Sequence, residues 1–294
     1  MSLDLSEEDW TRISRGGFNA QSDLEMAAAY GLFKGGEEIL QQHLGYSLMH
    51  ASLTEVITAG MEELAHRRIG LLTANDVVAR LDNALATGTG YSLIRFGDGE
   101  LLTLAQDSVL TSQEVQQAAP WLWLSGVTLP DLAARDQLVD AFIHADLVGV
   151  PTSRFMTYGS LFLRIAAYYH WSIDTMALTS SVINYMMFEE TNIYQRMLRR
   201  HKVLLIGNAS ESLHTALQAD GFSSVVGHIP ANGMASIPGV LADSLNYDFD
   251  VAFVAAGIPA CVICRYLRDR GKVAIDFGHL ADGLANKQLT LSVR

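Results

Sequence analysis

Short apolar runs alternate with amphipathic stretches from residue 91 to residue 276. The near-continuous apolar runs cover residues 91–96, 145–150, 202–206, 224–229, 250–254 and 272–276. The stretches between them place apolar residues at helical spacing, over about 131–144, 159–170, 179–199, 210–220 and 259–270. Strands that are apolar on both sides and separated by helices are typical of a parallel sheet covered on both faces. The pattern therefore predicts a doubly wound, mostly parallel, Rossmann-like α/β fold.

The first 85 residues follow a different pattern. Apolar residues recur at helical spacing over 24–33, Gly35-Gly36 interrupts them, and residues 37–44 resume the helical pattern. A further helix start at Ala74-Asn75-Asp76 precedes Val77, Val78, Leu81 and Leu85. We find no strand pattern here. We expect a helical N-terminal extension over residues 1–85 and an α/β catalytic domain over residues 86–294.

The acidic composition limits the classes of partner. Hydrophobic residues make up 49% of the chain, enough for a large core, and the formal net charge is −12. A surface of this sign repels phosphate backbones, so we expect no nucleic-acid partner. A small anionic ligand would need a metal ion, arginines or backbone N–H groups at its site.

The two cysteines, Cys261 and Cys264, form a C-x-x-C pair within an apolar run. A zinc site needs about four ligands, and no second cysteine pair accompanies this one. We interpret both as small buried residues of a helix, a use that fits a reducing cytoplasm. The N-terminus has no basic segment followed by an apolar core, and the apolar stretch 251–264 is short and contains Gly257 and Pro259. We therefore expect a cytoplasmic protein with no membrane span.

Polar residues and glycines follow five of the predicted strands. These strand ends are 97–100 (GDGE), 151–154 (PTSR), 207–210 (GNAS), 255–257 (AAG) and 276–279 (DFGH). Ligands of doubly wound proteins bind beyond the carboxyl ends of the strands. The pattern predicts a phosphate-binding or cofactor-binding site at that edge.

Asp98 and Glu100 are the most informative pair at these strand ends. Two carboxylates separated by one glycine suit a hard divalent cation, Mn²⁺ or Mg²⁺, which would bridge the phosphates of a nucleotide. Arg95 is close by in the sequence. An alternative is a tight turn in which Asp98 caps the following helix and Glu100 lies in its first turn.

The longer string Ser92-Leu-Ile-Arg-Phe-Gly-Asp-Gly-Glu100 resembles the signature of GT-D-type glycosyltransferases, a bacterial family with a Rossmann-like fold and a metal-binding D-x-E motif. The resemblance continues, in family order, over residues 147–154, 178–185, 202–208 and 271–282. It covers about residues 75–285. It implies a metal-dependent enzyme that moves a sugar from a nucleotide-sugar donor, a UDP-sugar, to a bacterial glycoconjugate or glycoprotein.

The resemblance also implies roles for individual residues. Asp98 and Glu100 match the motif that binds the metal and the diphosphate. Residues that would contact the nucleotide-sugar are Arg95, Ser153, Arg154, Asn184, Gly207, Asn208 and Gly257. Arg154 could pair with phosphate oxygens or be a solvated loop residue. Gly207 and Asn208 precede a helix whose N-terminus could bind a phosphate or be a plain turn, and Asn184 could contact the sugar or lie in the core.

The catalytic base is predicted at the end of the last strand. Asp276 and His279 are candidates to accept the proton of the acceptor hydroxyl. Alternatively, Asp276 joins the metal ligands and His279 only orients it.

Other interpretations remain open. Residues 204–210 loosely resemble the cofactor loop of S-adenosylmethionine-dependent methyltransferases, although only one glycine is present. A non-catalytic nucleotide-sugar-binding module is a further alternative. Aromatic residues at 121, 123, 168, 169 and 171 could stack on an acceptor sugar or only pack. The N-terminal helices could form a homodimer contact.

Overall fold

The structure is a computed structural model that describes residues 30, 31 and 33–291. It consists of two compact units, Met1–Arg68 and Ile69–Arg294. The helix predicted over residues 24–33 lies mostly outside the described residues.

The described part of the first unit is helical. It contains η1 (Phe33–Glu37, a π-helix), α3 (Glu38–Leu44), α4 (Leu53–Glu63) and η2 (Ala65–Arg67). A capping box starts α4, because the Ser52 hydroxyl accepts from the Glu55 N–H and the Glu55 carboxylate accepts from the Ser52 N–H. Helix α3 confirms the helix predicted over residues 37–44, with Glu37 as the last residue of η1.

The second unit is built on one parallel sheet of seven strands. Their bounds are β1 (Tyr91–Arg95), β2 (Leu147–Val150), β3 (Leu178–Ser180), β4 (Val203–Gly207), β5 (Val225–Ile229), β6 (Val251–Ala255) and β7 (Val273–Asp276). The strand order is β3-β2-β1-β7-β6-β4-β5, and all paired strands are parallel. The predicted doubly wound α/β class is confirmed.

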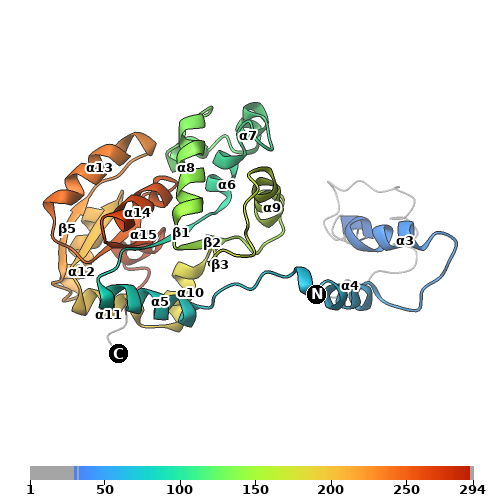
Figure 1. Cartoon of the computed structure of the whole chain (residues 1–294), viewed down its shortest axis with the longest axis horizontal. Helices are drawn as coiled ribbons and strands as arrows, with labels where there is room; N and C mark the ends of the chain where they lie inside the picture. Colours follow the sequence, from blue (N-terminus) through green and yellow to red (C-terminus); the bar gives the residue numbers. More distant parts are fainter. Residues whose placement is uncertain (1–29, 32, 292–294) are drawn as a thin grey trace. The chain divides into compact units, whose positions relative to one another are not determined.

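Helices connect the strands. They are α5 (Ala74–Thr87), α6 (Asp98–Ala105), α7 (Ser112–Ala118), η3 (Leu122–Ser125), α8 (Leu132–His144), α9 (Gly159–Tyr168), α10 (Ile183–Glu190), α11 (Ile193–Arg200), α12 (Ser210–Ala219), η4 (Met234–Ser236), α13 (Ile237–Asp243), η5 (Ser244–Asn246), α14 (Pro259–Asp269) and α15 (Leu280–Ala285). In Figure 1 the helices α8, α13 and α14 lie on one side of the strands, and α5, α10 and α11 lie on the other.

Strand alternation divides the interior into two cores. On β1, Ile94 belongs to the core shared with α6, α8 and α14, whereas Leu93 belongs to the core shared with α5, α11 and α15. The same alternation separates Val254 from Phe253 on β6. Successive side chains of a strand point to opposite faces, so a strand between two helical layers is apolar at every position.

One predicted element was wrong. The stretch 179–199, expected to be one helix, starts within strand β3 and then forms two helices, α10 and α11, that are interrupted at residues 191–192. Thr179 pairs with Gly149 of β2, and its hydroxyl donates to the Leu72 carbonyl at 2.8 Å. A strand of three residues is too short to show a periodicity of its own.

Helix α5 belongs to the second unit. The Thr73–Asp76 capping box starts it, and Val77 and Leu81 are fully buried in the core beneath the sheet. The division therefore falls after Arg68, whereas the sequence prediction placed it near residue 85. An amphipathic helix has the same periodicity in an extension as in a doubly wound domain, so the sequence could not assign α5 to either. Its burial against the sheet assigns it to the second unit.

Both cysteines are reduced and fully buried on α14. Burial raises the pKa of both thiols well above the usual value, so they remain protonated. The Cys261 thiol donates to the Arg95 carbonyl at 3.2 Å. Both side chains are therefore core residues, as predicted.

Within the described residues, no helix is both long enough and apolar enough to span a bilayer.

Candidate functional site

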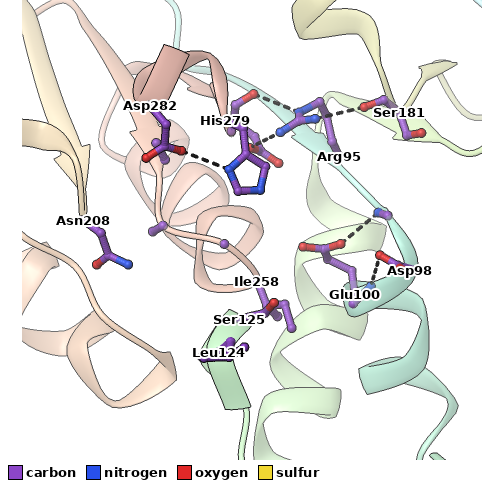
Figure 2. Close-up of a pocket in the computed structure, with 18 of the residues that line it drawn as sticks. Arg95, Asp98, Glu100, Leu124, Ser125, Ser181, Asn208, Ile258, His279 and Asp282 are labelled. Atoms are coloured by element: carbon purple, nitrogen blue, oxygen red, sulfur yellow. Dashed lines mark hydrogen bonds and ion pairs between the residues drawn. The ribbon is translucent and has the colours of Figure 1, made fainter. Parts of the chain in front are cut away.

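A cavity of about 460 Å³ opens at the carboxyl ends of the central strands. Its walls come from the segments that follow β1, β2, β3, β4, β6 and β7, together with η3 and the segment before η4. Predicted site residues that line it are Arg95, Asp98, Glu100, Asn208, Gly257, Asp276 and His279. Figure 2 shows Asp98 and Glu100 on one side of this cavity and His279 on the other.

Asp98 and Glu100 lie in the first turn of α6. The Gly97 N–H donates to Glu100 Oε2 at 2.8 Å, and the Gly99 N–H donates to Asp98 Oδ1 at 3.0 Å. Gly97, and not Asp98, is the N-cap of α6, and the Glu100 carboxylate binds its N–H from the first turn, as the alternative interpretation placed it. Both residues still line the cavity, so the capping and ligand-binding interpretations are compatible.

The surroundings of Glu100 disfavour the ionised form of its carboxyl group. Burial, followed by the nearby Asp276 carboxylate, raises the pKa of Glu100 to about 7. Among the described residues, neither Asp98 nor Glu100 forms an ion pair within 4 Å. A cation placed beside both would offset this unfavourable charge.

Tyr158 was missed by the sequence analysis. It lies just before α9, lines the cavity, and forms a side-chain hydrogen bond with Asp98, whose charge raises the pKa of the tyrosine. The aromatic ring comes from the segment after β2, which the sequence predicted to be at the site through Ser153 and Arg154. Those two residues are exposed and do not line the cavity.

Arg95 is held by four hydrogen bonds below the cavity. Its Nε donates to the Asp276 carbonyl at 3.1 Å, and Nη2 donates to Asp276 Oδ1 at 2.8 Å. Its Nη1 donates to the Ser181 carbonyl at 3.0 Å and to Asn184 Oδ1 at 3.1 Å. The guanidinium thus ties β1 to β7 and to the segment between β3 and α10, and most of its donors are occupied by protein atoms.

Asn184 and Gly278 shape the space around this guanidinium. Asn184 is fully buried, and its side-chain NH₂ donates to the Phe277 carbonyl at 3.0 Å. It therefore supports Arg95 from the core and does not line the cavity. Gly278 has a φ of +56°, and a Cβ there would lie 2.1 Å from Arg95 Nη2.

The two candidate bases have different environments. Asp276 is buried and ion-paired with Arg95, and burial raises the pKa of its carboxyl although the guanidinium opposes this effect. His279 is exposed at the cavity wall, and its Nδ1 lies 3.0 Å from Asp282 Oδ2. Asp282 also lines the cavity and was not singled out from the sequence.

Glycines allow close backbone approaches on the remaining walls. Gly207 does not line the cavity; a Cβ there would lie 2.1 Å from the Ala255 carbonyl of the neighbouring strand. Gly257, which lines the cavity, has a φ of +64°. Beside Gly257 the wall brings Gly126 and Gly233 together, since a Cβ on Gly126 would lie 2.7 Å from the Gly233 Cα. Neither Gly126 nor Gly233 follows a predicted strand in a recognisable motif, and we did not predict them at the site.

The donor set limits how a metal ion could bind. In the described part of the chain, no group of three or more His, Cys, Asp and Glu side chains is arranged to hold a metal. Two carboxylates are instead suited to Mg²⁺ or Mn²⁺ that takes its other ligands from water and substrate phosphates. Asp98 and Glu100 fit this kind of site.

Comparison with protein families identifies the chain. The sequence matches the profile of the GT-D fold-like domain over residues 72–284, well over half of its length. The chain belongs to the GT-D-like family. The GT-D-like region begins just before α5 and ends within α15, so it coincides with the second unit described above. No curated protein matches the chain.

Solved structures of other proteins resemble the chain. One, described as a domain of unknown function 1792 with a distinct glycosyltransferase fold, covers 81% of this chain and 88% of its own at 17% identity, with a TM-score of 0.49. Another, described as a new glycosyltransferase with this domain from Streptococcus sanguinis, covers 75% and 85% at 14% identity, with a TM-score of 0.47. The assignment of this chain to the GT-D-like family rests on the sequence profile.

Proposed function

We propose that the protein is a metal-dependent glycosyltransferase that moves a sugar from a UDP-sugar to a glycan or glycoprotein acceptor. The observation that carries this proposal is the Asp98–Glu100 pair at the cavity of a GT-D-like domain. The cavity volume falls within the range of roughly 300–1,000 Å³ that is typical of small-molecule sites.

The carboxylates of Asp98 and Glu100 would hold Mn²⁺ or Mg²⁺. When bound, the ion would neutralise charge on the donor diphosphate as it leaves. The raised pKa of Glu100 supports this role, because a partly buried carboxylate near Asp276 gains more from a neighbouring cation than a solvated carboxylate does. Tyr158, through its hydrogen bond, would orient Asp98.

The start of α12 is suited to the nucleotide. Asn208 and Ala209 line the cavity, and within the described structure no side chain caps the N-terminus of α12. Free N–H groups at a helix N-terminus favour phosphate or ribose oxygens. Asn208 would supply a further amide on the same wall, next to Gly257.

Arg95 has a supporting role in this proposal. Its donors are directed to Asp276, Ser181 and Asn184, so it would stabilise the strand ends on which the donor site is built. These hydrogen bonds and the one to the Asp276 carbonyl use four of its five N–H donors, which leaves at most one for contact with the diphosphate.

Calorimetry with UDP tests the donor site. We expect the wild-type chain to bind UDP in the presence of Mn²⁺, and Asp98→Asn or Glu100→Gln to weaken this binding at least about tenfold, which corresponds to ~1.4 kcal/mol. Glu189→Gln removes an exposed carboxylate from α10, remote from the cavity lining, and should leave binding unchanged.

Two results would contradict the proposal. One is the absence of UDP binding to the folded wild-type chain at saturating Mn²⁺. The other is equal affinity in Asp98→Asn, Glu100→Gln and wild type.

A further inference from the structure

His279 and Asp282 form a side-chain pair on the cavity wall opposite the proposed metal ligands. His279 directly precedes α15, and Asp282 lies in the first turn of that helix. The imidazole Nδ1 and the carboxylate Oδ2 are 3.0 Å apart. Figure 2 shows this contact, with the His279 ring between Asp282 and the cavity.

The pair selects one state of the imidazole. A carboxylate that accepts from Nδ1–H fixes the tautomer in which Nε2 carries a lone pair. The side chain of His279 is 91% exposed and that of Asp282 is 54% exposed, so an incoming acceptor can reach Nε2.

The other titratable groups at the cavity are already engaged. Asp276 is buried and accepts from Arg95 at 2.8 Å, and protonation would break this ion pair. Glu100 accepts from the Gly97 N–H, and Asp98 accepts from the Gly99 N–H and from Tyr158. Among the described residues that line the cavity, His279 is the only histidine.

We propose that His279 is the general base of the transfer reaction and that Asp282 is its positioning residue. This inference rests on the proposed glycosyltransferase function. Nε2 of His279 takes the proton of the acceptor hydroxyl while the acceptor oxygen forms a bond to the anomeric carbon. The bond from that carbon to the diphosphate oxygen breaks, and its electron pair leaves with UDP.

Release of UDP with water as the acceptor provides the assay. The full-length wild-type chain is screened with UDP-glucose, UDP-galactose and UDP-N-acetylglucosamine in the presence of Mn²⁺, and the fastest substrate is kept. We expect His279→Ala to lower kcat by roughly 10²–10⁴-fold, the usual contribution of a positioned base. KM, and the affinity for UDP with Mn²⁺ measured by calorimetry, should stay at wild-type values.

Two further measurements separate chemistry from structure. Imidazole added to the buffer should restore part of the activity of His279→Ala, because the site is open to solvent. Asp282→Asn should lower kcat less than His279→Ala does, and the double variant should be no slower than His279→Ala alone, since Asp282 acts through the imidazole.

His144→Ala is the matched control. His144 pairs with Asp140 at 3.0 Å at the end of α8, with a partly exposed side chain, but it does not line the cavity. Its loss should leave kcat unchanged.

The possible failures are distinguishable. A wild-type chain that releases no UDP from any of the three donors overturns the glycosyltransferase proposal together with this inference. A wild-type chain that releases UDP while His279→Ala keeps the same kcat overturns the base assignment alone. A double variant that is slower than His279→Ala, by the factor that Asp282→Asn causes alone, overturns the positioning role of Asp282.

Discussion

At the scale of single residues, the candidate site depends on the partly buried guanidinium of Arg95 and the space around it. Arg95 bridges β1, β7 and the segment before α10, and it can do so only because Gly278 has no side chain. The φ of +56° at Gly278 is also in the left-handed region that glycine tolerates best. Gly278 therefore meets two requirements, one conformational and one steric.

Replacing Gly278 with alanine should destabilise the protein for both reasons. Gly271 has a φ of +75° with open space around it, so Gly271→Ala measures the conformational cost alone, about 1 kcal/mol. We expect Gly278→Ala to cost at least ~1 kcal/mol more, since Arg95 must move and lose a hydrogen bond. Urea denaturation of the two variants measures the difference, and equal losses would show that Arg95 accommodates the methyl group freely.

At the scale of secondary-structure elements, strand ends and helix starts line the cavity, while the faces of the helices pack against the sheet. α6 and α15 start at the cavity, and the uncapped start of α12 adjoins it.

Away from the cavity, α12 packs against β5, and this contact contains the histidine pair His214 and His228, with ring centroids 5.4 Å apart.

The histidine pair should make stability depend on pH. Burial, followed by repulsion from His228, lowers the pKa of His214 below its usual value of 6.5. The unfolded chain therefore binds a proton more readily than the folded chain, so stability is present above pH 6.5 and is lost as the pH falls through the folded pKa.

Thermal unfolding at pH 7.5 and 5.5 tests this dependence. The decrease in Tm from pH 7.5 to pH 5.5 should be smaller for His214→Gln than for the wild-type chain. His144→Gln, at an exposed position on α8, should retain the wild-type loss. The same loss in His214→Gln as in wild type would contradict the expectation.

At the scale of the whole molecule, the sheet and its two helical layers lie within the second unit. The cavity and all of its lining residues belong to that unit, as does the region matched by the GT-D-like family profile. The first unit contributes no lining residue in the described part of the chain.

A chain that starts at Ile69 should therefore fold and keep the donor site. Thr73 and Asp76, which cap α5, are retained in it, so its first helix is complete. We expect its Tm and its Mn²⁺-dependent affinity for UDP to match those of the full chain. Loss of cooperative unfolding in this truncated chain would show that the first unit is needed for the fold.

The sequence by itself determined the class of the fold and the edge of the sheet at which the cavity lies. Strands that are apolar at every position indicate a sheet buried on both faces. Parallel strands bring their carboxyl ends to one edge of the sheet, so the positions of Asp98, Asp276 and His279 in the chain were enough to place them near one another. Tertiary structure alone decided which groups are available there. Arg95 and Asn184 are engaged inside the protein, Ser153 and Arg154 lie away from the cavity, and Tyr158 and Asp282 join it. These outcomes depend on side-chain direction and on contacts between distant segments, and local periodicity carries no information about either.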